Sequence, residues 1–414
     1  MKIGRVHLLA LAAGGCVLLG AGTAGAGTAA VQCGTTLTSS TALKADLVQC
    51  PGTGLVIGAD NITVDLGGHT ISGTNAAGGE GIANDGHAGV RIVNGKISDF
   101  RLNGVGIRGA QNATVSRLTI RRIGAGGAEG EPVSAGIAIV DSPNSQVIGN
   151  DVANDVTAYQ SDGVDILNSH GSLVRGNTLS HNAWNGLVLI GSANSKITGN
   201  ELDANANNGV EVNGESDSVW VARNRADRNT SLGIVVGDLH GARVTANTAR
   251  GNDTGIFFFD LHDSVISDNT TIGNGTGLAL AGGQFGSDGN TLTRNDASRN
   301  LGTGIALTNG ADKNTVSHNT ANANQGGIDQ GGGIFIGAST GNALIGNVAS
   351  NNNDSGIEFG EDTPGDSAGN SLKGNAANKN RNHGIDAVTG TVDGGGNHAS
   401  GNAVQPQCNN VVCS

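Results

Sequence analysis

Apolar and polar positions alternate along this chain in short groups, and most groups begin with a glycine. Apolar residues follow the glycine at the first and third positions, with variable residues between them. The shortest steps between groups are 22 to 24 residues, and the longer steps of 27 to 32 carry extra loop residues. A period of two predicts half-buried β-strands. The glycines are Gly104, Gly136, Gly163, Gly186, Gly209, Gly233, Gly255, Gly277, Gly304, Gly333 and Gly356, with a weaker copy at Gly384.

A second marker, two asparagines spaced by five, runs in phase with the glycines. Asparagine tolerates left-handed backbone, and stacked asparagine side chains can bond to the copies above and below. Each repeat therefore has three short strands divided by Asn or Gly corners. The pairs are Asn177/Asn182, Asn200/Asn205, Asn224/Asn229, Asn247/Asn252, Asn269/Asn274, Asn295/Asn300, Asn319/Asn324, Asn347/Asn352, Asn375/Asn380 and Asn397/Asn402.

Three strands in each repeat predict an all-β fold: a single-stranded parallel β-helix with three sheets and about 12–14 coils. No segment keeps a 3.6-residue period for a full helix, and the leucine-rich consensus is absent. From Leu55 to Asn402 the repeats resemble the right-handed parallel β-helix, or pectin-lyase-like, superfamily. Residues 61–71 (Asn-Ile-Thr-Val-Asp-Leu-Gly-Gly-His-Thr-Ile) resemble the opening coil of bacterial exported β-helix repeat proteins.

The start of the chain has the features of a secretory signal peptide, which we place at residues 1–30. Lys2 and Arg5 precede an apolar run from Leu8 to Leu19, which is shorter than a bilayer span. We therefore expect a protein that is secreted or lies on the cell-envelope exterior of a bacterium. After signal cleavage we expect a monomer without membrane attachment.

Four cysteines remain, at the two ends of the mature chain, in a compartment that favours disulfides. Four cysteines allow three pairings, and we expect Cys33–Cys50 and Cys408–Cys413, which close local loops. Residues 31–54 are expected to form an N-terminal cap with a short helix at 40–47 over the open end of the strand stack. Residues 55–402 are expected to form the β-helix, and residues 403–414 a tail that contains the Cys408–Cys413 loop.

The composition of the chain indicates what kind of core it forms and which classes of partner it is expected to bind. Aromatic residues make up 2% of the chain, so the core is expected to be thin and aliphatic. Loss of two of the 23 basic residues with the signal leaves 21 against 35 acidic residues, a net charge of −14. That balance argues against nucleic acid as a partner.

Outward positions of the glycine-led strands carry the candidate chemistry. Strand alternation places the second and fourth residues after each glycine outward. Asp165 and Glu211 stand at second positions about 10 Å apart, two strand spacings. Arg108 and Phe259 stand at fourth positions, and Phe257 at a second. Exposed aromatic rings beside acids are typical of a sugar-binding surface, so we expect a polysaccharide as partner.

Loops that border this sheet add further candidates. Tyr159, Asp162, His181 and Trp184 lie just before two of the glycine-led strands and are candidate substrate contacts. On the opposite border, Asp238-Leu239-His240 and Asp260-Leu261-His262 stand in equivalent places of successive repeats. Asp238, His240, Asp260 and His262 are the candidate metal ligands. The simpler interpretation is that these aspartates are turn residues and these histidines lie on the surface.

The resemblance implies a catalytic role for some of these residues. Lyases of the pectate-lyase type use Arg or Lys as base and acids that hold calcium against the uronate. Arg108 is then the candidate base. Asp165, Glu211 and Asp141 are candidate acids, and calcium is the candidate cofactor. The signature segments of polygalacturonases, pectate lyases and alginate epimerases are absent, so no family's catalytic set is carried over.

Three functions remain open at this point. We favour a lyase or epimerase that acts on an acidic polysaccharide. The alternatives are a non-catalytic glycan-binding or surface-scaffold β-helix, and a metal-handling exported β-helix like the maturation factors of copper enzymes.

Overall fold

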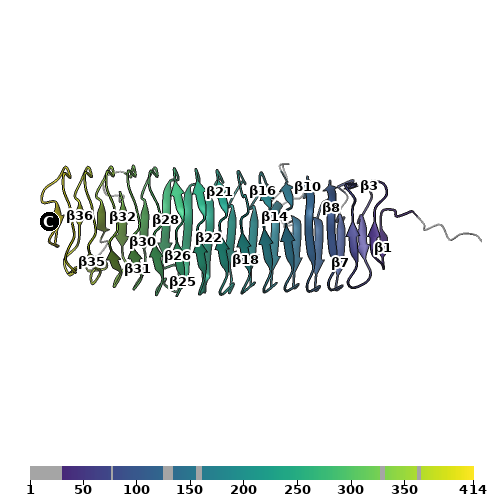
Figure 1. Cartoon of the computed structure of the whole chain (residues 1–414), viewed down its shortest axis with the longest axis horizontal. Helices are drawn as coiled ribbons and strands as arrows, with labels where there is room; N and C mark the ends of the chain where they lie inside the picture. The colour runs from purple at the N-terminus through teal and green to yellow at the C-terminus, as the bar shows by residue number, and fades with distance from the viewer. Residues whose placement is uncertain (1–29, 76–77, 125–133, 155–160, 327–331, 361–364) are drawn as a thin grey trace, which may run out of the picture. The chain divides into compact units, whose positions relative to one another are not determined.

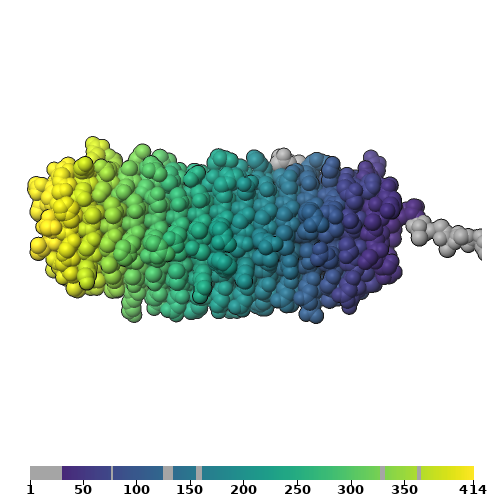
Figure 2. Space-filling view, in the orientation of Figure 1, coloured from purple at the N-terminus to yellow at the C-terminus, as the bar shows by residue number. Residues whose placement is uncertain are grey.

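The structure, a computed structural model, describes residues 30–75, 78–124, 134–154, 161–326, 332–360 and 365–414. The chain divides into two units, Met1–Val31 and Gln32–Ser414. Residues 1–29, almost the whole of the expected signal peptide, lie outside the described residues. In the second unit, short parallel strands stack coil on coil along one axis (Figure 1). The space-filling view shows successive coils in close contact from the purple to the yellow end (Figure 2).

The first face of the solenoid, called sheet A below, has 16 parallel strands. Its strands from β9 to β36 are the glycine-led segments that the sequence predicts. They are β1 (Thr35–Leu37), β4 (Leu55–Ile57), β7 (Ile82–Asp85), β9 (Asn103–Arg108), β11 (Ser134–Val140), β14 (Ser161–Leu167), β17 (Leu187–Ile190), β19 (Val210–Asn213), β22 (Leu232–His240), β25 (Thr254–His262), β28 (Thr276–Ala281), β30 (Ile305–Thr308), β32 (Ile334–Gly337), β34 (Ile357–Gly360), β36 (Ile385–Asp386) and β38 (Cys408–Asn409).

The second face continues the path of each coil after sheet A. It contains β2 (Thr41–Ala42), β5 (Thr63–Asp65), the first halves of β8 (Arg91–Ser98) and β10 (Thr114–Arg121), β12 (Gln146–Ile148), β15 (Leu173–Arg175), β18 (Lys196–Thr198), β20 (Trp220–Ala222), β23 (Arg243–Thr245), β26 (Val265–Ser267), β29 (Thr291–Thr293), β31 (Thr315–Ser317), β33 (Ala343–Ile345), β35 (Ser371–Lys373) and β37 (Val392–Asp393).

The third face closes each coil. It contains β3 (Leu47–Cys50), β6 (Thr70–Gly73), the second halves of β8 and β10, β13 (Asp151–Ala153), β16 (Thr178–Leu179), β21 (Arg225–Asp227), β24 (Thr248–Arg250) and β27 (Thr270–Ile272). Single bridges carry it onward through Asp296, Thr320, Val348, Ala376 and His398.

Alternation of side chains fixes what lies inside. In β25, Ile256 and Phe258 are fully buried, whereas Phe257 and Phe259 are partly exposed on the outer side. Buried aliphatic residues fill every coil in this manner, which confirms the thin core. Gly255 shows why the column is glycine: a Cβ there would lie 2.6 Å from the carbonyl oxygen of Gly277 and 2.7 Å from Nδ2 of Asn274.

The paired asparagines form two buried ladders at the corners of the third face. In each rung the backbone N–H and the side-chain Nδ2 donate to Oδ1 of the asparagine one coil on, and most Nδ2 groups also donate to a backbone carbonyl. Asn247, for example, donates to Asn269 from its N at 2.9 Å and from its Nδ2 at 3.0 Å. At the C-terminal end Gln407 replaces the next rung, since its Oε1 accepts from N and Nδ2 of Asn402.

The expected helix at residues 40–47 is wrong. Residues 41–42 and 47–50 are β2 and β3, which pair with β5 and β6, and the described residues contain no helix. Leu43 and Leu47 are buried in the first coil of the solenoid, so strand pairing and burial override the local helical pattern. The predicted count of 12–14 coils is too low, because strands β1 and β38 extend sheet A beyond the expected limits of the β-helix.

The two predicted disulfides are confirmed. Cys33 and Cys50 join β3 to the segment before β1. Cys408 and Cys413 close a short loop at the last coil. Both ends of the strand stack are thus held by a covalent link.

Candidate functional site

Two aspartates on β14 form the centre of the candidate site. Asp162 is 4% exposed and Asp165 is 8% exposed, and each carboxyl group acts on the pKa of the other. Asp162 Oδ1 also accepts the backbone N–H of Asn185 at 2.7 Å. Within the described residues, Oδ1 of Asp165 is buried and has no hydrogen-bond partner. Two buried carboxyl groups that act on each other in this way disfavour a second negative charge, so the pair retains a proton more readily than an exposed aspartate does.

The pKa values of this pair follow from burial and from like charges. Burial raises the pKa of Asp162 to about 7, and the nearby Glu211 charge adds to the rise. Burial also raises the pKa of Asp165 well above its usual value, and the charges of Asp162 and Glu211 raise it further. The pair therefore keeps a proton at a pH at which ordinary aspartates are ionised.

Glu211 lies on β19, in register with Asp165 across β17. The strand pairing runs from Asp165 through Val188 to Glu211. Two amides donate to the Glu211 carboxylate: Asn213 Nδ2 to Oε1 at 2.9 Å and Asn208 Nδ2 to Oε2 at 3.3 Å. One site thus has a proton-holding pair and a separate carboxylate.

The structure places Asp162 and Asp165 on β14 and Glu211 two strands further on, on β19. Asp162 was expected only as a substrate contact, so its part in the acid pair was missed. A signal was present in the sequence: Asp162 stands directly before a glycine, where Asn103, Asn185 and Asn208 stand in other coils. Asn208 donates to the acid three residues on, and Asp162 contacts Asp165 at the same spacing.

Arg108 lies apart from this cluster, at the end of β9, two strands before β14 in sheet A. Its guanidinium forms an ion pair with the buried Glu80, and Nη1 contacts Asp85 Oδ1 at 3.3 Å. The hydrogen bond to Glu80 raises the pKa of Arg108. A guanidinium held in this way is a poor proton acceptor, and its role as base stays a prediction. Asp141 lies at a corner, where Asn168 Nδ2 donates to it at 3.2 Å.

The candidate substrate contacts are spread along the borders and the outer side of sheet A. Trp184 is 36% exposed and its backbone N–H donates to Ser161, which places it in the coil between Asp162 and Glu211. His181 is exposed at the corner before it. Tyr159 lies outside the described residues. Phe257 and Phe259 lie two strands beyond β19, with ring centroids 6.0 Å apart.

The four candidate metal ligands line one hollow of about 440 Å³, together with Glu215, Asp217, Leu239 and Phe285. The rings of His240 and His262 stack with centroids 4.8 Å apart. His262 Nδ1 lies 2.5 Å from Asp288 Oδ1. Asp260 accepts the backbone N–H groups of Gln284 and Phe285, so its oxygens are used to hold a loop.

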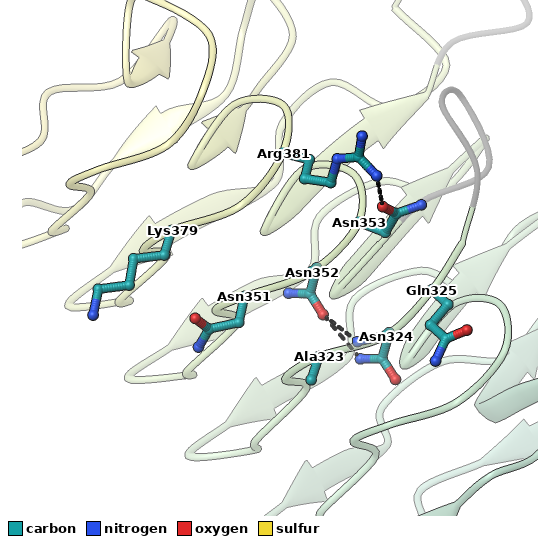
Figure 3. A pocket seen from close by; sticks show the side chains of 8 residues that line it. All are labelled: Ala323, Asn324, Gln325, Asn351, Asn352, Asn353, Lys379 and Arg381. Carbon is teal, nitrogen blue, oxygen red and sulfur yellow. Dashed lines mark hydrogen bonds between the residues drawn. The ribbon is translucent and has the colours of Figure 1, made fainter.

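Another hollow of about 410 Å³ lies at the corner of the second asparagine ladder (Figure 3). Arg381 Nη1 donates to Asn353 Oδ1 at 2.6 Å, and Lys379 points away from the ladder. Asn324 and Asn352 bond to each other as ladder rungs. Many of the polar groups that line this hollow are therefore already engaged in hydrogen bonds that hold the fold.

The fold, the disulfides and the outward acid cluster define an extracytoplasmic parallel β-helix protein of the pectin-lyase-like fold. The chain belongs to the NosD family. The family model, described as "Periplasmic copper-binding protein (NosD)", matches residues 61–240, 132–284, 228–329 and 283–405. Overlapping matches of this kind are typical of repeats.

Solved structures with a similar fold include a mutant of the periplasmic alginate epimerase AlgG, at 15% identity, TM-score 0.45, with 86% of this chain and 77% of that chain covered. The Dettilon tailspike protein matches at 14% identity and TM-score 0.45, with 80% of this chain and 62% of the tailspike covered. The A-module of the Azotobacter vinelandii mannuronan C-5 epimerase AlgE4 matches at 12% identity and TM-score 0.36, with 92% and 90% covered. The curated proteins include no match.

The family's description implies copper. Thiolate, thioether and imidazole groups are its usual ligands. The cysteines of the described residues are all in disulfides, and the chain's one methionine is Met1. No group of three or more His, Cys, Asp or Glu among the described residues is placed to hold a metal ion. These residues do not fit a copper centre.

In the part of the chain that the structure describes, no helix is long and apolar enough to cross a membrane.

Proposed function

We propose that this protein is an exported polysaccharide-processing enzyme whose acid–base groups are Asp162, Asp165 and Glu211. The observation that carries the proposal is the Asp162–Asp165 pair. In the coil of Glu211 the equivalent contact is an amide donating to a carboxylate, which needs no extra proton. A buried carboxyl pair with raised pKa values is a feature of acid–base sites.

The outer side of sheet A supports a long ligand. Its strands follow one another in register, so a linear polymer can lie across several coils. Trp184 lies beside the acid cluster, and Phe257 and Phe259 lie about 19 Å from Asp165, four strand spacings along the sheet. Partly exposed rings at both places suit the apolar faces of sugars.

The narrower expectation of a lyase or epimerase acting on an acidic glycan, with Arg108 as base and calcium as cofactor, belongs to the same proposal. It has less support from the geometry, because Arg108 is paired with Glu80 and Asp85 and lies two strands from the acid pair. The calcium requirement stays a prediction. The carboxyl cluster is therefore the better-supported catalytic group.

The test is product formation by the full mature chain and by Asp165→Asn. The protein is incubated with uronate polymers, with and without calcium, and with neutral polymers. Products are measured as unsaturated ends, changed epimer ratio or new reducing ends. We expect product from the wild type and a loss of at least about 100-fold in Asp165→Asn, because general acid–base catalysis contributes roughly 10²–10⁴-fold.

Glu201→Gln is the matched control, since Glu201 is exposed on the third face ten residues before Glu211. Its activity is expected to equal that of the wild type. Glycan retention without any product would contradict the proposal and favour the non-catalytic binding or scaffold function. Circular dichroism of each variant establishes that the fold is kept.

A further inference from the structure

The outer side of the second face carries basic side chains and no acids over many coils. Its strands from β12 to β35 contain no Asp or Glu, although the chain has 35 acidic and 23 basic residues. Four exposed cations lie on or directly after four successive strands of this face, and they are called the basic row below. They are Arg175 on β15, Lys196 on β18, Arg223 after β20 and Arg243 on β23.

Trp220 contacts two members of the basic row. On β20 it lies in register with Lys196 on one side and with Arg243 on the other. Lys196 Nζ lies 5.9 Å from the centroid of the Trp220 ring, and Arg223 Cζ lies 5.8 Å from it. An aromatic ring attracts cations through its quadrupole. Because the ring carries no net charge, the two cations keep their charge and can still bind an anion.

The four cations of the basic row form no ion pair with any acid in the part of the chain that the structure describes. Arg294 shows the contrast, since its Nε lies 2.8 Å from Oδ1 of Asp268 one coil before it. Asp217, at the corner just before β20, accepts the backbone N–H of His240 at 2.7 Å and so holds the corner. Like charges on one face repel each other, and a bound anion relieves this repulsion.

We propose that the basic row binds a linear acidic polysaccharide, whose carboxylate or sulfate groups contact the cations while the polymer lies along the axis of the stack. This surface goes beyond the proposed function, because it lies on a different face from the acid pair of sheet A. From β15 to β23 the row spans three strand spacings, about 14 Å. One cation at each strand suits a polymer with about one charge on each sugar better than DNA, which carries a charge about every 1.7 Å.

The experiment measures retardation of the full mature chain by affinity electrophoresis in gels that each contain one polymer. Dextran sulfate and polygalacturonate are the acidic probes, dextran is the matched neutral polymer, and polydeoxythymidylate is the nucleic acid. We expect retardation by both acidic glycans and none by dextran. The retardation should weaken as the salt concentration rises, because salt screens exposed charges.

The double variant Lys196→Gln/Arg243→Gln is expected to raise the Kd for dextran sulfate at least about tenfold, because affinity for a polyanion depends steeply on the charges that the protein neutralises. Arg250→Gln/Lys379→Gln is the matched control. It removes two exposed cations from the end of β24 on the third face and from the corner of the second asparagine ladder, and it should bind like the wild type. Trp220→Leu keeps the net charge and should weaken binding, because two cations lose the ring that holds them.

Several outcomes would overturn the proposal. They are equal retardation by dextran and dextran sulfate, equal losses in the two double variants, and no retardation of the folded protein by either acidic glycan. Stronger retardation by polydeoxythymidylate than by the acidic glycans would also overturn it and make the ligand a nucleic acid. Asp165→Asn is expected to bind dextran sulfate like the wild type, and a loss of binding in this variant would place the polymer on sheet A instead. Binding by the basic row and catalysis on sheet A can therefore fail separately.

Discussion

Asp162 occupies a position that other coils give to asparagine, and the single change of amide to carboxyl alters the chemistry of the site. Asn185 and Asn208 follow it at the same place in the next two coils, and each accepts or donates within the same corner. Asp162 keeps the structural bond to the N–H of Asn185. Asp162 also acts on Asp165, and two buried carboxyl groups favour a retained proton, whereas an amide at position 162 would need none.

The exchange Asp162→Asn therefore changes how stability depends on pH. The folded pair keeps a proton up to about pH 7, whereas an unfolded aspartate loses it near its usual pKa of about 3.9. Between these values the folded state binds more protons, so stability falls as pH rises. In Asp162→Asn we expect the amide to donate to Asp165, so the loss of stability with rising pH is smaller than in the wild type.

We predict that Asp162→Asn is more stable than the wild type at pH 8, by on the order of a few kcal/mol, because each pKa unit corresponds to about 1.36 kcal/mol. The difference should shrink towards pH 5. Thermal unfolding across this range measures it, with Glu201→Gln as control. Parallel pH profiles for Asp162→Asn and the wild type would be inconsistent with a proton held by the pair.

At the scale of the element, the asparagine ladders fix the corners of the coils. Asn247 Oδ1 accepts the N–H and the Nδ2 of Asn224, at 2.9 and 3.0 Å, and Asn247 donates onward to Asn269. Removal of this amide leaves the buried backbone N–H of Asn224 without its acceptor and takes one of two acceptors from its Nδ2, which still donates to the carbonyl of Ile197.

Asn247→Ala is accordingly expected to lower the free energy of unfolding by at least about 2 kcal/mol, because each buried group left without a partner costs about 1–3 kcal/mol. Urea unfolding followed by circular dichroism measures the change. Gln325→Ala is the matched control: this exposed amide follows the ladder residue Asn324 and should leave stability within about 0.5 kcal/mol of the wild type. Equal losses in the two variants would show that the ladder contributes nothing particular.

Most of the fold could be predicted from the sequence because one short motif repeats. The glycine column, the paired asparagines and the alternation in β25 each report the same coil. The helix predicted at residues 40–47 is wrong because capping residues and apolar spacing there are also typical of a short helix. The partner strands β5 and β6 lie further along the chain. Local patterns do not record such pairing partners.

The candidate site was predictable only in part. The outward direction of Asp165 and Glu211 follows from strand period, and their joint cluster follows from the register of the coils. The contact between Asp162 and Asp165 depends on side-chain geometry, as does the capture of Arg108 by Glu80. Neither follows from the period alone.

At the scale of the whole molecule, the solenoid presents one long sheet whose strands from β11 to β38 carry acidic side chains and no Lys or Arg. One disulfide closes a loop in the first coil and the other closes a loop in the last coil, so each end of the stack has its own covalent link. A rigid face of this kind keeps the acid pair and Glu211 at a fixed spacing along a polymer. The account therefore depends on one proton at one place on this face.

Infrared difference spectroscopy across a pH titration tests that proton most directly. The wild type is expected to show the carbonyl band of a protonated carboxyl group that persists at pH 6, because burial raises the pKa of both Asp162 and Asp165. The double variant Asp162→Asn/Asp165→Asn should lack this band, and Glu201→Gln should keep it. A wild-type spectrum without a protonated carboxyl group above pH 5 would contradict the account.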